Sequence, residues 1–297
     1  MRHHPSIPLI GFVVATLAGC TAPPPMDGHT CDTISESIAD PNAMPDDVVT
    51  YLADHHWSHM HLDFHVARMW DVLDMDTQTW AAGMGIARAP KQEGEPTTGL
   101  EFLAMHRLML TELRGQFPDH AALFVGWETP PTDPSSPDGP LPAGTPAFDP
   151  DMVKGIARIE TQPDSFTSDD DFALFLQTKR RPTAADKYAR SKDPSAGIHN
   201  YVHNRWQSDS PINVGDPAVN LQNQVFWRVH GWVDTQWTAY RKAKGLDDAT
   251  DPVYLAALAD AQTWMDAAMM RGEMAAGSKA DDACETEPDQ IKTIFSE

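Results

Sequence analysis

Histidine spacing constrains the fold of this chain more than any other feature. In each half of the sequence, two histidines four residues apart are followed by a single histidine on a later segment. These residues are His61, His65 and His106 in the first half and His199, His203 and His230 in the second. A spacing of four places two imidazoles on one face of a helix, one turn apart. The sequence therefore predicts two matched pairs of helices, each carrying three histidines.

The single histidine of each half lies on an apolar helical face. His106 shares its predicted face with Phe102 and Leu110, and His230 shares its face with Phe226. One core histidine is more often a packing residue than a metal ligand, but two matching triplets indicate ligands for two metal ions. Three imidazoles per ion, without a carboxylate or thiolate at matched positions, suit copper or zinc. The spacing alone leaves both metals open.

The remaining pattern predicts a mainly α fold, a helical bundle with long irregular loops. The predicted helices span 46–73, 100–113, 169–178, 197–207, 220–244 and 251–274. Pro45 and the acidic pair after it are typical of a helix start. We expect loops at 82–98 and at 129–150, where eight prolines occur in 22 residues. The sequence has no βαβ pattern and no run of alternating strands.

The N-terminus predicts export. Arg2 precedes an apolar run, residues 7–17, which is too short for a membrane anchor. The segment Leu17-Ala18-Gly19-Cys20 resembles a bacterial lipobox. This resemblance implies a signal peptide over 1–19, a lipid on Cys20 and a tether and lead-in over 20–45. By the same resemblance, Thr21 after the cysteine favours anchoring in the outer membrane, with the protein facing the periplasm or the cell surface. The alternative is an ordinary secretory signal with a chance cysteine.

Charge and cysteine content limit the partners and the compartment. The formal net charge of −21 argues against nucleic-acid partners and against electrostatic docking on anionic lipid. If Cys20 carries lipid, Cys31 and Cys284 remain, and in an exported chain they can form a disulfide or stay two unrelated thiols. Because the histidine patterns use both halves, we interpret 46–297 as one domain.

The second half resembles the copper B region of tyrosinases, catechol oxidases and molluscan haemocyanins. The stretch from Phe226 to Trp237 matches the family block Phe-Trp-x-x-His-x-x-Val-Asp-x-x-Trp. The first half resembles the copper A region, because Phe102 to Arg107 matches its Phe-Leu-x-x-His-Arg helix. The resemblance spans roughly 48–244 and implies a copper A half over about 46–128 and a copper B half over about 195–245.

Some positions depart from the family pattern. Val229 stands where the family usually has the first of two histidines, and Asn223-Gln224 replaces its Asp-Pro. Thr97 and Thr98 occupy the place of the middle copper A ligand. Two ligands of the first ion must therefore come from the histidine-rich segment that precedes Val66.

This segment offers two choices of ligands. The internal repeat predicts His61 and His65. Helical periodicity instead favours His55 and His59, unless the helix breaks near Ser58 and the exposed face changes. We prefer the repeat.

The family resemblance implies a type-3 dicopper oxidoreductase that oxidises phenols or catechols to o-quinones with dioxygen. By the same resemblance, Asn200 matches a position that helps hold a water thought to deprotonate monophenols. An acidic residue also holds that water in the family. Asp186 and Asp193 lie near Asn200 in sequence, but neither is identified as this acidic partner. Arg107 and Asp234 are expected either to pair behind the ligands or to be two solvated charges.

Other functions remain open at this point. The alternatives are a non-catalytic copper- or dioxygen-binding lipoprotein and a degenerate tyrosinase-like protein. A partner protein can also be required to deliver copper.

Overall fold

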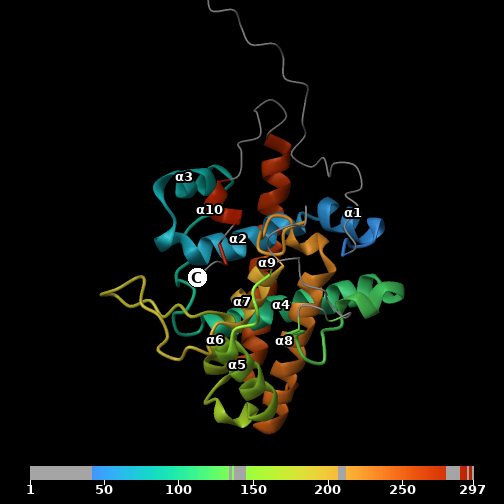
Figure 1. Ribbon diagram of the computed structural model, residues 1–297. Coiled ribbons are helices and arrows are strands. Elements are labelled where there is room, and N and C mark those ends of the chain that lie inside the picture. Colours follow the sequence, from blue (N-terminus) through green and yellow to red (C-terminus); the bar gives the residue numbers. More distant parts are fainter. Residues whose placement is uncertain are drawn as a thin grey trace, which may run out of the picture. The chain divides into compact units, whose positions relative to one another are not determined.

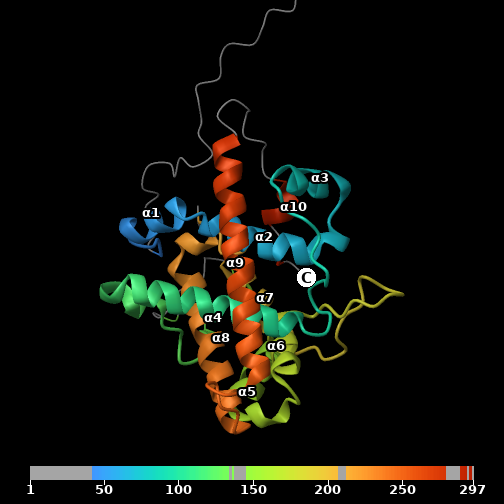
Figure 2. The same cartoon turned by 180° about the vertical axis from the view of Figure 1, so that it is seen from behind.

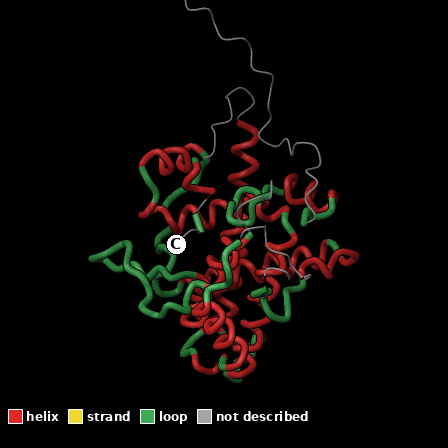
Figure 3. Tube along the Cα trace, viewed as in Figure 1, coloured by secondary structure: helices red, strands yellow, loops and turns green. Residues whose placement is uncertain are grey.

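Mainly helical structure fills the part of the chain that the computed structural model describes, which confirms the predicted fold class (Figures 1 and 3). That part comprises 42–133, 136, 145–206, 212–278, 288–292 and 294–295. These residues contain isolated β-bridges but no strand. The predicted signal peptide, the predicted lipid attachment site Cys20 and the cysteines Cys31 and Cys284 lie outside them. Within the described ranges, no helix has both the length and the apolar character of a membrane span.

The predicted helix over 46–73 is wrong as a single element, because the chain breaks in its middle. Helix α1 (Asp46–Asp54) ends at His55, and α2 (Trp57–Met69) starts after His56, whose φ of 56° is left-handed. The break changes the phase of the apolar face, so that Trp57 packs with the α1 residues Val48 and Leu52 in one core. A 3-10 turn, η1 (Trp70–Val72), follows α2.

Helix α3 (Met75–Gly83) and α4 (Thr98–Gln116) flank a loop close to the predicted one at 82–98. Asp74 caps α3 by accepting from the Thr77 N–H at 2.7 Å, a cap that the sequence analysis did not use. Helix α4 is longer than predicted, and its buried face includes Phe102, His106 and Leu110. The 3-10 segment η2 (Pro118–Phe124) comes next.

Two helices in the middle of the chain lie below α4 in Figure 1. Helix α5 (Pro150–Thr161) was not predicted; Asp149 caps it, and Pro150 occupies its first position. Turn η3 (Pro163–Ser165) leads to α6 (Asp169–Gln177), which agrees with its predicted range. Helix α6 approaches α4 closely, since a Cβ on Gly99 would lie 2.7 Å from the Leu174 nitrogen.

The second histidine pair and its partner lie on α7 (Ile198–Arg205) and α8 (Gln224–Ala243). The predicted helix over 220–244 starts later, because turn η4 (Asn220–Gln222) precedes Asn223, whose side chain caps α8 through the Val225 N–H. Helix α9 (Pro252–Ser278) then crosses α2 and α4, as Figure 2 shows. The short α10 (Asp289–Lys292) was not predicted.

A backbone contact fixes where α8 lies. A Cβ on Gly126, just after η2, would lie 1.8 Å from the Trp232 nitrogen, and one on Gly231 would lie 2.3 Å from the Gly126 nitrogen. Both positions therefore require glycine. Gly231 follows His230 directly in α8, so this contact also fixes the position of His230 relative to the backbone at Gly126.

Candidate metal centre

Four helices bring the six predicted histidines together. Helices α2 and α4 contribute the first triplet, and α7 and α8 contribute the second. The first triplet is His61, His65 and His106, and the second is His199, His203 and His230. Each of these side chains is at most 2 % exposed. In each triplet, one nitrogen per ring lies within 4.8 Å of the other two, so each triplet can hold a metal ion.

The distances between nitrogens agree with a metal site. The Nε2 atoms of His61 and His65 are 3.2 Å apart. The Nε2 atom of His230 lies 3.3 Å from that of His199 and 3.2 Å from that of His203. A tetrahedral ion about 2.0–2.1 Å from each nitrogen separates its ligands by about 3.3 Å. The rings in these three pairs are therefore spaced as two ligands of one ion would be.

Hydrogen bonds orient four of the rings. The Nδ1–H groups of His106 and His203 donate to the carbonyls of Phe102 and Val214, both at 2.8 Å. The His61 Nδ1–H donates to the carbonyl of Pro217 at 3.3 Å. His199 donates in the same way to Asn200, as described below. A proton on Nδ1 leaves the Nε2 lone pair for a metal.

Several buried ring nitrogens have no hydrogen-bond partner. They include Nε2 of His106 and Nδ1 of both His65 and His230. A buried polar atom without a partner costs about 1–3 kcal/mol. An ion in the first triplet would satisfy the His106 Nε2, so the residues present fit a bound metal.

Burial also keeps the rings neutral, as metal ligation requires. Desolvation lowers the pKa of all six imidazoles, and it brings the pKa of His61 to about 3 and that of His203 to about 4. Repulsion among neighbouring imidazoles adds to this effect for His65 and His230.

The two triplets face each other across a stacked pair of rings. The His106 and His230 rings are nearly parallel, with centroids 3.9 Å apart and planes inclined by 4°. Phe102 and Phe226 pack against these rings, with Phe102 4.5 Å from His106 and Phe226 4.3 Å from His230. The centre is thus enclosed by aromatic side chains.

Phe295, near the C-terminus, covers the histidines from another side. Its ring centroid lies 4.7 Å from His65, 4.9 Å from His203 and 5.7 Å from His199, so it touches both triplets. The Asn204 amide holds it by donating to the Phe295 carbonyl at 2.8 Å. The sequence analysis missed this residue, because no local pattern connects it to histidines that lie so far away in the chain.

Asn200 connects the second triplet to a buried carboxylate. Its Oδ1 accepts from the His199 Nδ1–H at 2.9 Å, and its amide donates to Oε1 of Glu93 at 3.4 Å. The Gln177 amide donates to the other Glu93 oxygen at 3.5 Å. Glu93 was also missed, because it sits in a polar loop without a motif.

The acids nearest to Asn200 in sequence have other partners. Asp193 pairs with Arg158 at 3.4 Å and accepts from Ser195, and Asp186 accepts from the Tyr188 N–H. Neither is bonded to Asn200.

Two further expectations concern residues around the centre. Arg107 and Asp234 do pair, with 2.5 Å between Nε and Oδ1, and Arg107 also stacks on Trp237. His55 is exposed and stacks on Tyr51, away from both triplets. The internal repeat therefore identified the clustered histidines, and the helical periodicity of an unbroken helix did not.

A scan against models of known protein families finds no match, and a search of curated proteins finds none either.

Proposed function

We propose that this chain is a type-3 dicopper oxidoreductase that oxidises phenols or catechols to o-quinones with dioxygen. The observation that carries the proposal is the pair of facing triplets, in which six buried neutral imidazoles converge without a carboxylate. Imidazole suits both copper and zinc, but two three-histidine sites that face each other favour the copper pair. The family resemblance of the Phe102–Arg107 and Phe226–Trp237 segments supports the same conclusion.

Each triplet would hold one copper ion. The ions, when bound, supply the redox chemistry by which two catechols and one dioxygen give two quinones and two waters. Asn200 orients His199, and its amide holds the Glu93 carboxylate, to which we assign the role of accepting a phenolic proton. Phe102 and Phe226 exclude water from the histidines.

The test combines metal content with turnover. We expect metal-free protein to take up two copper ions per chain and then to oxidise 4-methylcatechol. His106→Ala and His230→Ala should each bind fewer than two ions and lose turnover. His55→Ala, which alters an exposed histidine outside the triplets, should behave like the wild type. Fewer than one copper per wild-type chain, or uptake of zinc alone, would contradict the proposal.

Phe295 favours a second candidate, a copper- or dioxygen-binding protein without turnover. Its ring covers His65 and His203, where a phenol would have to approach. Two bound coppers with an oxygen-dependent near-ultraviolet absorption band, but without catechol oxidation, would support this candidate over the first.

We also propose that the chain is exported and anchored by lipid on Cys20, on the strength of the segment Leu17–Cys20. Cells grown with labelled palmitate should label the wild-type protein but not Cys20→Ser. Equal labelling of the two proteins would contradict the proposal.

A further inference from the structure

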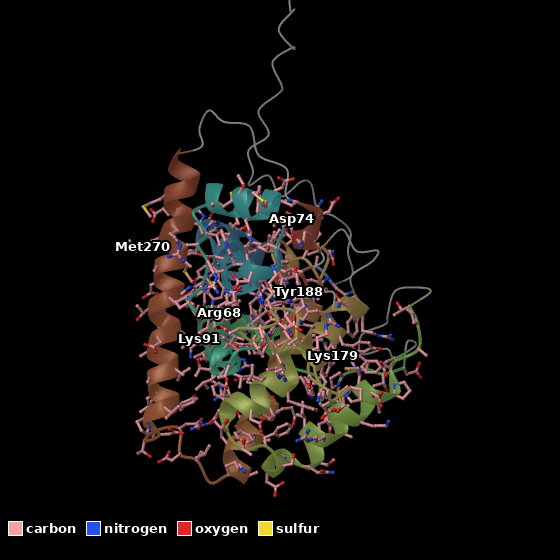
Figure 4. The ribbon with its side chains drawn as sticks, turned by 90° about the vertical axis from the view of Figure 1, so that its left-hand side faces the viewer. Arg68, Asp74, Lys91, Lys179, Tyr188 and Met270 are labelled. Atoms are coloured by element: carbon pink, nitrogen blue, oxygen red, sulfur yellow. The ribbon has the colours of Figure 1, made fainter. Side chains whose placement is uncertain are left out.

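A pocket of about 450 Å³ lies beside the C-terminal end of α2. Its walls come from the loop between α3 and α4 and from the long loop between α6 and α7, which Figure 3 shows as one continuous loop. Arg68 and Met69 of α2 form part of the lining. Figure 4 looks onto this side of the molecule, where Arg68, Lys91, Lys179 and Tyr188 are labelled. A volume of this size is typical of a small-molecule site.

The cations that line the pocket differ in whether they are paired. Arg88 forms a bidentate ion pair with Asp71 at 2.6 Å. Arg68 pairs with Glu101 at 2.8 Å, and the Lys187 ammonium donates to the Asp71 carbonyl. Arg88 and Arg68 therefore have carboxylate partners within the protein, and the Lys187 ammonium has a carbonyl partner.

Arg180 is the exception. Within the described part of the chain its guanidinium has neither an ion pair nor a hydrogen bond, and its Nε is buried without a partner. A guanidinium offers five N–H donors in a planar fork that matches an oxyanion. In a chain with a net charge of −21, an arginine left unpaired in a pocket points to an anionic ligand.

The backbone holds Arg180 in place. Gly94 has a φ of 90°, and a Cβ there would lie 2.3 Å from the Arg180 carbonyl oxygen, so the two loops are in direct contact. Arg180 also forms an antiparallel bridge with Arg190. Next to it, the Arg181 guanidinium donates to the carbonyls of Thr178 and Leu174 at 2.7 and 2.8 Å. The unpaired guanidinium therefore projects from a fixed segment.

Two of the lining residues connect the pocket to the histidines. Glu93 lines the pocket, and through Asn200 it is two hydrogen bonds away from His199. Met69 lines the pocket too, and it belongs to the same apolar cluster as Phe295. Glu93 therefore belongs both to the pocket lining and to the hydrogen-bonded series that ends at His199.

We propose that this pocket selects phenolic substrates that carry a carboxylate, with Arg180 binding that carboxylate and the ring directed toward Glu93. The proposal rests on the proposed function. Four cations and three carboxylates line the pocket, the acids being Asp71, Glu93 and Glu95, so the lining carries a single net positive charge. That balance suits a monoanionic carboxylate better than a dianionic phosphate.

The kinetic test compares 3,4-dihydroxyphenylacetate with 4-methylcatechol in copper-loaded protein. Arg180→Gln should raise KM for the carboxylated catechol about tenfold without changing kcat, and it should leave both constants for 4-methylcatechol unchanged. Arg190→Gln is the matched control, because it removes the same charge from an exposed position of the same loop outside the pocket. An equal KM for 3,4-dihydroxyphenylacetate in wild type and Arg180→Gln overturns the proposal.

A binding test separates this proposal from the proposed function. We expect phenylacetate to bind metal-free wild type and Arg190→Gln in calorimetric titrations, but to bind Arg180→Gln at least tenfold more weakly. If no catechol is oxidised while this pattern holds, the proposed function fails and the anion site stands. Tighter binding of inorganic phosphate than of phenylacetate, or equal binding of phenylacetate to wild type and Arg180→Gln, overturns the anion site as proposed.

Discussion

At the scale of single residues, Asn200 lies between a metal-ligand candidate and a carboxylate, and each of its two bonds has its own consequence. Its oxygen fixes the proton of His199 on Nδ1, while its amide binds Glu93. Replacing Glu93 breaks the second of these hydrogen bonds and leaves the hydrogen bond between His199 and Asn200 intact. Metal affinity and proton transfer can therefore be separated by mutation.

We predict that Asn200→Ala weakens copper binding by about 10–100-fold, because His199 loses the acceptor that orients it. Competition with a chelator of known affinity measures the change. Glu93→Gln is the contrasting variant, since it retains the His199–Asn200 bond. It should bind copper like the wild type and lose catechol oxidation. A copper affinity that falls equally in both variants would show that the two bonds are not separable.

Arg241 is the buried cation of a second cluster, in which it contacts Asp169, Asp248 and Asp251 at 2.9, 2.6 and 2.9 Å. Arg241→Met leaves these carboxylates facing one another, and we expect it to lower the free energy of unfolding by about 3 kcal/mol. Urea denaturation at pH 7 measures this loss. Arg190→Met, on an exposed position, should change the free energy of unfolding little. A loss of equal size in both variants would contradict the stabilising role of Arg241 among these carboxylates.

The same cluster predicts a dependence on pH. Hydrogen bonding to Arg241 lowers the pKa of Asp251 below its ordinary 3.8 in the folded state. The unfolded chain therefore binds a proton first as the pH falls, so this contribution is complete above pH 3.8 and is lost below it. The stability difference between wild type and Arg241→Met should shrink from pH 5 to pH 2. A constant difference would mean that Asp251 is not the titrating partner.

At the scale of helices and loops, the sequence predicted the elements whose apolar pattern is long and regular. Helices α6, α8 and α9 fall close to their predicted ranges for this reason. The break at His55 and His56 has no strong local signal. It turns the apolar face of α2 so that Trp57 is buried in the same core as Leu52, and this requirement comes from tertiary packing. Asp149-Pro150 is a recognisable helix start, but the surrounding prolines led us to interpret it as loop.

The same distinction holds for the candidate site. The histidine triplets were predictable, because their spacing repeats within the chain. Glu93 and Phe295 were not, because each reaches the histidines only through contacts between segments that lie far apart in sequence. The unpaired state of Arg180 likewise becomes visible only when its neighbours are placed.

The C-terminal segment that carries Phe295 makes a prediction about access. Phe295→Ala removes the ring that covers His65 and His203, so we expect kcat/KM for 4-methylcatechol to rise severalfold in copper-loaded protein. Asp289→Asn changes α10 at an exposed side chain and should leave kcat/KM unchanged. An unchanged or lower kcat/KM in Phe295→Ala at full copper content would show that phenols approach elsewhere.

At the scale of the whole molecule, each metal ion would join two helices, α2 and α4 at the first triplet and α7 and α8 at the second. Because α2, α4, α7 and α8 all supply histidines, unfolding any of them would release an ion. At a hundredfold excess over Kd, two independent sites would contribute about 5 kcal/mol, or about 10 °C or more in Tm. Chelator treatment should lower Tm by this amount, and copper should restore it. His106→Ala, which removes a ligand of the first triplet only, should show about half of this chelator effect; an equal effect would place the metal elsewhere.

The stacked rings of His106 and His230 have a consequence for the order in which the ions arrive. Fixing either imidazole restricts the other, since the rings lie face to face at 3.9 Å. Binding of the first ion would then include the entropy loss of ordering both triplets, so the second ion would bind more tightly. Loading should be cooperative: at half-saturating copper, native mass spectrometry should find chains with two ions or none, and few with one.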